Sequence, residues 1–259
     1  MSPRSLDSPM ALTVAIVQLN SGARRFLPYV AGLLQAYVQA YAPNPAAYNF
    51  LPPLAEFESL AQSVAHLLSA DIVGFSAYIW NIERSLAIAK QLKQLKPEIF
   101  ILFGGPQVPN QAEAFLSQYP QIDICVHGEG EAPFLAILER YRDRDWSKLS
   151  GISYLDKHKT FHTHPSGARR KSLSELPSPY LLGVFEPLMT QAPPEHEWAI
   201  LWETARGCPF SCTFCDWGSA TQSKVNGFDL NRLKAELDWF GRQKIGYIFC
   251  CDANFGILT

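Results

Sequence analysis

The feature that most constrains the fold is a regular alternation of short apolar runs with amphipathic stretches over the first half of the chain. Five runs rich in β-branched and aromatic residues predict strands, at 12–17, 48–51, 71–76, 99–103 and 122–126. The segments that follow them have apolar residues at helical spacing and predict helices at 26–41, 54–68, 82–95, 110–118 and 132–141. Five β-α units in this order favour an α/β fold with a doubly wound parallel sheet and helices on both faces.

Length and composition are typical of a globular protein with a large core. The chain has 259 residues, of which 47% are hydrophobic, so it has room for more than one domain. Its net charge of -2 gives no reason to expect nucleic acid as a partner. No apolar run approaches the ~18 residues of a membrane span, and residues 1–10 are polar, without the apolar segment of a signal peptide. We therefore expect a cytoplasmic protein without a membrane or nucleic-acid partner.

Ligands of doubly wound sheets bind at the carboxyl ends of the strands, so these ends are the first place to look for a site. They are the segments 18–20, 76–81, 104–106 and 127–131. A phosphate-accepting receiver domain needs carboxylates after the first and third strands to hold magnesium, and glutamine, asparagine and serine stand there. A dinucleotide site needs G-x-G-x-x-G after the first strand, where the chain has only Gly22. Both classes are disfavoured.

The second half of the chain has three cysteines within eight residues, namely Cys208, Cys212 and Cys215. Gly207, Pro209 and Ser211 between and beside them favour a loop. Three thiolates on one loop can hold a metal centre and leave a tetrahedral metal or a four-iron cube one ligand short, which opens a position for a substrate. Two alternatives remain: a helix with three buried thiols on one face, and a zinc site completed by His196, Cys250 or another residue.

The spacing C-x3-C-x2-C, with Phe214 before the third cysteine and the lead-in 203–209, resembles the cluster loop of the radical S-adenosylmethionine (SAM) superfamily. The resemblance implies that Cys208, Cys212 and Cys215 hold three irons of a 4Fe-4S cluster. It implies that the fourth iron binds SAM, that the cluster reductively cleaves SAM, and that Phe214 lies against the adenine. A strand at 198–204, a helix at 229–242 and a strand at 245–251 are expected to be the first units of a partial (β/α) barrel.

The end of the last expected strand departs from the superfamily pattern. There, a Gly-Gly-Glu stretch usually contacts the amino group of SAM, whereas this chain has Cys251-Asp252-Ala253-Asn254. Asp252 or Asn254 could accept the ammonium hydrogen bond, and a turn cap is the alternative. Cys250 and Cys251 point to opposite sides of the strand and are expected to be packed thiols.

The strand ends of the first half resemble the Rossmann-like cobalamin-binding domain fused to many radical SAM enzymes. Ser76 after the third strand and Gly104-Gly105 after the fourth match its pattern, and Gly128-Glu129-Gly130-Glu131 resembles its last loop. The resemblance implies that the corrin and its nucleotide tail are contacted by Ser76, Gly104, Gly105, Gly128, Glu129 and Gly130. The first strand is not followed by the D-x-H-x-x-G of cobalamin-dependent mutases. Water, Tyr78 or Trp80 is therefore expected near the lower face of cobalt.

These interpretations divide the chain into a cobalamin-binding domain at 11–145, a linker with a short hairpin at 146–197, and the start of a radical SAM domain at 198–259. A complete barrel takes on the order of 250 residues, so the chain is expected to be the front part of a longer enzyme, with the barrel truncated. The resemblance implies methyl transfer to an unreactive centre, a small-molecule or peptide-derived substrate, and a reductant such as flavodoxin or ferredoxin. The alternatives are a non-catalytic cobalamin-binding module with a vestigial cluster loop and a zinc-binding regulatory protein.

Overall fold

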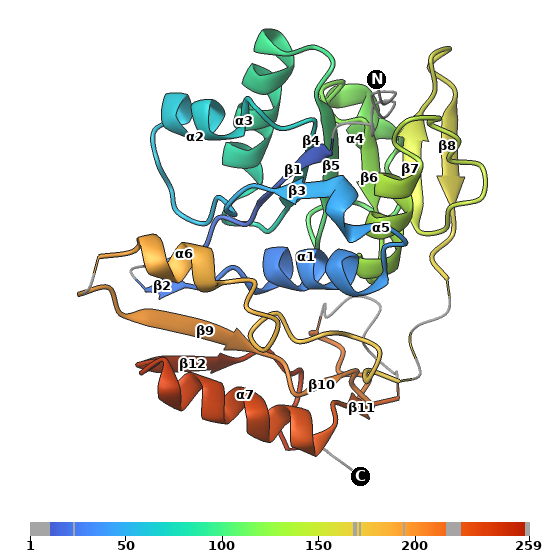
Figure 1. Cartoon of the computed structure of the whole chain (residues 1–259). Coiled ribbons are helices and arrows are strands. Elements are labelled where there is room, and N and C mark those ends of the chain that lie inside the picture. Colours follow the sequence, from blue (N-terminus) through green and yellow to red (C-terminus); the bar gives the residue numbers. More distant parts are fainter. Residues whose placement is uncertain are drawn as a thin grey trace, which may run out of the picture.

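The five apolar runs form the parallel part of a seven-stranded sheet (Figure 1). The computed structural model describes residues 11–22, 24–167, 170, 172–193, 195–215 and 224–256. The order is β3-β1-β4-β5-β6-β7-β8, with parallel strands β1 (Leu12–Val17), β3 (Tyr48–Phe50), β4 (Ile72–Ser76), β5 (Phe100–Gly104) and β6 (Ile124–Val126). The expected hairpin, β7 (Ile152–Leu155) and β8 (Phe161–His164), extends this sheet antiparallel to β6. The predicted α/β parallel sheet is confirmed.

Helices cover both faces of this sheet, as a doubly wound fold requires. Successive side chains of a strand point to opposite faces. Val14 and Ile16 therefore belong to one core and Ala15 and Val17 to the other. The first core contains residues of α1 (Tyr29–Tyr41) and α5 (Glu131–Glu139). The second contains residues of α2 (Leu60–Leu67), α3 (Ile82–Leu95) and α4 (Glu113–Gln118).

A second, three-stranded sheet has the order β12-β9-β2, and all its neighbours are parallel. Its strands are β2 (Arg25–Phe26), β9 (Trp198–Trp202) and β12 (Tyr247–Cys250), and α7 (Leu230–Arg242) connects β9 to β12. This β-α-β unit is what the opening of a barrel requires. The remaining short elements are η1 (Pro45–Ala47), α6 (Glu186–Gln191), β10 (Ala205–Arg206) and β11 (Asn226–Gly227). None of the helices in the described ranges has both the length and the apolar character to cross a membrane.

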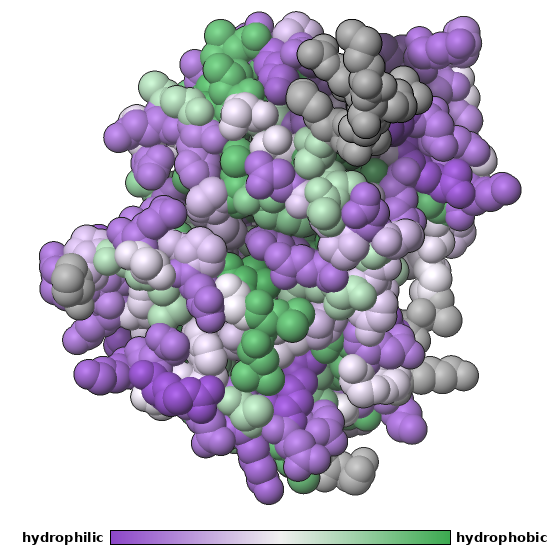
Figure 2. All heavy atoms as spheres, in the orientation of Figure 1, coloured by the Kyte–Doolittle hydropathy of each residue, from purple (hydrophilic) through white to green (hydrophobic). Residues whose placement is uncertain are grey.

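One apolar core joins the two sheets. It contains Val14 of β1, Ile200 of β9 and Tyr180, which is 1% exposed. The Tyr180 ring stacks on Tyr29 of α1 at a centroid distance of 6.0 Å and meets Phe240 of α7 edge-on at 5.0 Å. The face seen in Figure 2 is mostly polar, with apolar surface gathered across its middle, near α1 and the carboxyl end of β9. The two sheets therefore share packed side chains.

Helix α2 begins six residues later than the expected start at Leu54, so that prediction was wrong. Leu54 is buried and extended beside β1, where its N–H donates to Ile16 O and its carbonyl accepts from Gln18 N. The helix is instead capped by Ser59, whose hydroxyl accepts from Gln62 N while Gln62 Oε1 accepts from Ser59 N. This capping box is the sequence signal that would have placed the start correctly.

Two other helices also begin later than expected. Helix α1 starts at Tyr29 and not at Phe26, because Arg25 and Phe26 pair with β9 of the second sheet. Helix α4 starts at Glu113 and not at Asn110. The first error has a clear cause: a strand of two residues that pairs with a segment far along the chain leaves no local periodicity.

Gly104 and Gly105 differ sharply in what their backbone requires. Gly105 has a φ of +104°, and a Cβ there would lie 2.7 Å from Ala77 O. The carbonyl of Ala77 is fixed by Gln107 N, so it cannot move away easily. A Cβ at Gly104 would lie 3.6 Å from Val126 Cβ, which is an ordinary contact. Gly105 is thus required by the close approach of the loops after β4 and β5.

We predict that Gly105→Ala lowers the free energy of unfolding by about 1–3 kcal/mol, because it adds a strained φ and a steric clash with backbone. Gly104→Ala is the matched control and should change the free energy by less than about 1 kcal/mol. Urea denaturation followed by circular dichroism measures both. Equal stability of the two variants would contradict the proposed backbone constraint at Gly105.

Candidate functional site

An aromatic pair, with Tyr78 partly buried and Trp80 exposed, lies at the carboxyl edge of the main sheet, beyond β4. Tyr78 and Trp80 stack with their ring centroids 4.6 Å apart and their planes 11° from parallel. Trp80 is 48% exposed, and its indole N–H donates to Leu19 O at 3.0 Å. Burial raises the pKa of Tyr78, so its hydroxyl stays protonated at neutral pH. The pair offers a flat, fixed surface at the place where a ligand of this fold binds.

The loops after β1 and β4 are tied together beside this pair. Asn81 is 1% exposed, and its side-chain nitrogen donates to Leu19 O at 3.1 Å and to Ser76 O at 3.0 Å. Its side-chain oxygen accepts from Tyr78 N at 2.8 Å. Because β1 and β4 are neighbours from which the chain proceeds to opposite sides of the sheet, these loops flank the switch point of the fold. Ser76 is buried there, where the sequence placed it.

The loop after β1 contains no histidine, and its first side chain has a structural role. Gln18 is 4% exposed and accepts from Ala31 N of α1 at 3.1 Å. A histidine does follow β6, where His127 Nε2 lies 2.8 Å from Ser153 Oγ. Burial lowers the pKa of His127, so the ring is neutral at pH 7. Next to it, Gly128 has a φ of +71°, and a Cβ there would lie 3.1 Å from Ser166 Oγ.

The cysteine segment 207–215 is a loop, as predicted, and not a helix. Cys208 is buried, whereas Cys212 and Cys215 are exposed. Phe214 is 90% exposed, which leaves its ring free to contact a ligand. Among the described residues, no group of three or more Cys, His, Asp or Glu side chains is gathered to hold a metal ion. The donor chemistry suits an iron-sulfur cluster, and joining the three thiolates on one cluster requires the loop to draw together.

Asp252 and Asn254, which follow β12, bind the segment that leads from β9 into the cysteine loop. Asp252 Oδ1 accepts from Thr204 N at 2.7 Å and from Ala205 N at 3.0 Å, and its Oδ2 accepts from the Thr204 hydroxyl. These bonds join the segment after β12 to the segment after β9, 48 residues earlier in the chain. The side-chain nitrogen of Asn254 donates to Cys208 Sγ at 3.2 Å, which places Asn254 beside the first cysteine of the cluster motif.

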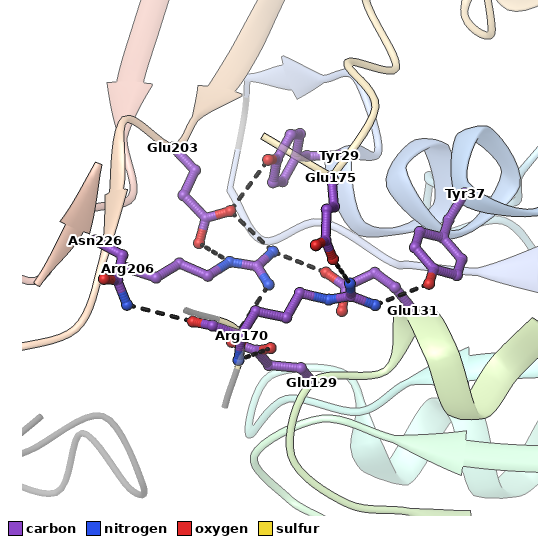
Figure 3. Close-up of polar contacts among 9 residues, drawn as sticks. All are labelled: Tyr29, Tyr37, Glu129, Glu131, Arg170, Glu175, Glu203, Arg206 and Asn226. Atoms are coloured by element: carbon purple, nitrogen blue, oxygen red, sulfur yellow. Dashed lines mark hydrogen bonds and ion pairs between the residues drawn. The ribbon is translucent and has the colours of Figure 1, made fainter. Parts of the chain in front are cut away.

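Arg206, two residues before Cys208, lies at the centre of a buried ionic network (Figure 3). Its Nε donates to Glu203 Oε1 at 2.9 Å, and its Nη2 donates to Glu203 Oε2 at 3.1 Å and to Glu131 Oε1 at 2.8 Å. Glu129 Oε1 lies 3.7 Å from Nη1. The Tyr29 hydroxyl also donates to Glu203, at 3.1 Å. Glu129 lies in the loop after β6 and Glu131 is the first residue of α5, so Arg206 connects the main domain to the second sheet.

Arg170 is the second guanidinium of Figure 3 and binds the same region. Its Nη2 donates to the Tyr37 hydroxyl at 2.9 Å and its Nη1 pairs with Glu175 at 3.0 Å. Its backbone N–H donates to Glu129 Oε2 at 3.4 Å, and its carbonyl accepts from the Asn226 side chain at 3.3 Å. Glu129, which the sequence assigned to cofactor contact, is therefore engaged by both arginine residues.

Burial and pairing oppose each other in this network. Burial raises the pKa of Glu203, and Arg206 acts against that rise. For Arg206, burial lowers the pKa, but Glu203 and Glu131 outweigh it and the pKa is raised above its usual value. The guanidinium is thus held in its charged form. Charge-assisted, bidentate contacts of this kind are the stronger hydrogen bonds of proteins and fix geometry as well as energy.

Glu203 and Arg206 lie in the lead-in to the cysteines and Glu131 lies in the 128–131 motif, but the sequence predicts no role for any of the three. The available signal was charge: the 128–131 loop carries two carboxylates, and the lead-in to the cysteines carries an arginine. Pairing them needs the tertiary structure, because Glu131 and Arg206 are 75 residues apart in the chain.

Comparisons with known proteins agree with this architecture. The family described as "B12 binding domain" matches residues 25–138. The chain is 39% identical over 236 residues to 2-(S-pantetheinyl)-carbapenam-3-carboxylate methyltransferase of Streptantibioticus cattleyicolor. It is 38% identical over 236 residues to the cobalamin-dependent radical SAM methyltransferase TokK of Streptomyces tokunonensis. Each match covers 90% of this chain and 34% of the relative, so the chain spans about a third of the length of these curated proteins.

Solved structures show the same fold. OxsB, a cobalamin-dependent SAM radical enzyme with aqua-cobalamin and SAM bound, matches with a TM-score of 0.72 and 20% identity, over 95% of this chain and 34% of that one. TsrM, a radical SAM methyltransferase from Kitasatospora setae, matches with a TM-score of 0.69 and 15% identity, over 95% of this chain and 48% of that one. Residues 25–138 thus match the B12 binding domain family, and 90% of the chain is similar to a part of two curated methyltransferases, one of them described as cobalamin-dependent and radical SAM.

Proposed function

We propose that this chain is the part of a cobalamin-dependent radical SAM methyltransferase that holds cobalamin and the 4Fe-4S cluster. The observation that carries the proposal is the position of the cysteine loop. It begins directly after β10, and Arg206 of β10 binds Glu131, the first residue of α5, at the carboxyl edge of the cobalamin-binding fold. SAM held at the cluster would have to lie close to cobalamin for a methyl group to pass between them, and the contact between Arg206 and Glu131 supports such an arrangement.

Residues of the cysteine loop and of the segment after β12 would bind the cluster and SAM. Cys208, Cys212 and Cys215 would hold three irons, and Phe214 would lie against the adenine of SAM. Asn254, which bonds to Cys208, would accept the hydrogen bond of the SAM amino group. Asp252 is instead bonded to the backbone of Thr204 and Ala205. When bound, the cluster supplies the electron that cleaves SAM, and cobalamin carries the methyl group.

On the cobalamin side, Ser76, Gly104 and Gly105 and the segment 128–130 would contact the corrin and its nucleotide tail. Tyr78 and Trp80 would lie under the lower face of cobalt, where they exclude water and offer no strong ligand. Cobalamin held there would supply a methyl carrier, and these two side chains would offer it an aromatic surface without a histidine. The stacked geometry of the pair supports this role.

The whole protein's substrate and partners follow from the same proposal. We propose a small-molecule or peptide-derived substrate with an unreactive acceptor centre, and a reductant such as flavodoxin or ferredoxin in the cytoplasm. There are two competing functions: a non-catalytic module that binds cobalamin alone, and a regulatory protein that binds zinc alone. Elemental analysis after anaerobic purification distinguishes the three functions. The proposed enzyme should contain iron, sulfide and cobalt, the cobalamin-binding module cobalt without iron, and the regulatory protein zinc.

For the cluster, we expect the protein reconstituted without oxygen to hold roughly four irons per chain and to show broad visible absorption. Cys212→Ala should lose most of both, because two thiolates hold the cube poorly. Cys125→Ala is the control: burial raises the pKa of the Cys125 thiol to about 12, which makes it an inert thiol in the core of the main sheet. Iron content that is unchanged in Cys212→Ala, with tight zinc binding, would refute the iron-sulfur assignment.

For cobalamin, we expect added hydroxocobalamin to bind with its lower base displaced and without a histidine ligand. Trp80→Ala should weaken binding about three- to tenfold, since an aromatic contact contributes ~0.5–1.5 kcal/mol. Leu95→Ala, an exposed apolar residue at the end of α3, is the control and should bind like the parent protein. A spectrum of histidine-ligated cobalt, or equal affinity of the Trp80 and Leu95 variants, would count against the proposed lower face.

A further inference from the structure

Arg206 is bound from both sides of the junction between the two sheets. Glu203 follows β9, while Glu131 is the first residue of α5 in the main domain. The arginine side chain is 13% exposed and those of Glu203 and Glu131 are 17% and 5% exposed. These charges are therefore paired away from solvent, where screening by salt is weak.

Glu131 depends on Arg206 more than on other groups. Its Oε1 accepts the hydrogen bond from Arg206 Nη2 at 2.8 Å. Its Oε2 is buried, and within the described part of the chain it has no hydrogen-bond partner. Without the guanidinium, a buried carboxylate would lose its charge partner, which strongly disfavours separation of the two loops.

Arg206 lies two residues before Cys208, the first cysteine of the cluster motif. Arg206 pairs with Asn226 in the short β10–β11 ladder. Gly207, the single residue between Arg206 and Cys208, has a φ of +114°, and a Cβ there would clash with the Lys224 carbonyl. Because only Gly207 separates Arg206 from Cys208, the position of Cys208 depends on that of Arg206.

We propose that Arg206 is a positioning residue that sets the distance between the cluster loop and the cobalamin-binding domain by binding Glu131 and Glu203 together. The inference rests on the proposed function, because it takes segment 207–215 as the cluster loop. It goes further in assigning the spacing of the two cofactors to one side chain.

The first test uses hydrogen–deuterium exchange of the cofactor-free protein, so that it does not depend on loading. In Arg206→Gln and Glu131→Gln, the backbone amides of 207–215 should exchange about tenfold faster, while those of β4 and β5 stay unchanged. Arg206→Lys should be intermediate, because an ammonium keeps the charge but cannot bind two carboxylates in the same fork geometry. Glu139→Gln, exposed at the other end of α5, is the matched control and should behave like the parent protein.

The second test reads the spacing in the loaded protein. With the cluster reduced and the cobalamin in its cobalt(II) form, pulsed electron paramagnetic resonance measures the dipolar coupling between the two spins. The parent protein and Glu139→Gln should show one narrow distribution of distances, and Arg206→Gln and Glu131→Gln a broader or shifted one. Iron content and cobalamin affinity should stay close to those of the parent protein, because the cysteines and the loops after β1 and β4 are intact.

The outcomes distinguish a failure of the proposed function from a failure of the positioning role of Arg206. A parent protein that takes up no cluster or no cobalamin refutes the proposed function, and the positioning role with it, before any variant is measured. A parent protein that loads both, with unchanged loop exchange and spin coupling in Glu131→Gln and Arg206→Gln, leaves the proposed function standing and overturns the positioning role. If Arg206→Gln disturbs the strand amides, Glu131→Gln decides alone, because it keeps the side-chain shape and removes only the charge.

Discussion

A buried guanidinium has to be paired, and in this protein that requirement holds the two halves of the site together. Arg206 is surrounded by Glu203, Glu131 and Glu129, which come from two different sheets. Removing one partner of a buried ion pair typically costs about 3–5 kcal/mol, because the other charge is left without compensation. The geometry of the junction is therefore specified by charge as well as by apolar contact.

The apolar contacts around this network make the junction continuous. Tyr29 is a member of both: its hydroxyl donates to Glu203, and its ring stacks on Tyr180 in the shared core. The β2 strand lies in the segment between β1 and α1, yet it pairs with β9 of the second sheet. The two sheets are thus connected by backbone pairing, through β2, and by side-chain packing, through Tyr29. Such a junction suits the proposed site, in which the cluster and cobalamin would lie at a set distance.

At the carboxyl edge of the main sheet, one carbonyl organises the candidate cobalamin side. Leu19 O accepts from both Trp80 and Asn81, so the loop after β1 fixes the aromatic pair that follows β4. The loop that carries a cobalt-binding histidine in mutases therefore has a different task here. It supports a surface beside the switch point, and it caps α1 through Gln18.

The sequence by itself determined the α/β alternation, the parallel sheet and the loop character of 207–215, because strand and helix periodicity and turn residues are local signals. It also placed Ser76, Tyr78, Trp80 and the three cysteines at strand ends, since spacing alone locates them. Only the tertiary structure decided that Arg25 and Phe26 form a strand, that Leu54 extends beside β1, and that Arg206 binds Glu131. Each of these depends on a partner far along the chain, and such a partner leaves no periodic trace near the residue itself.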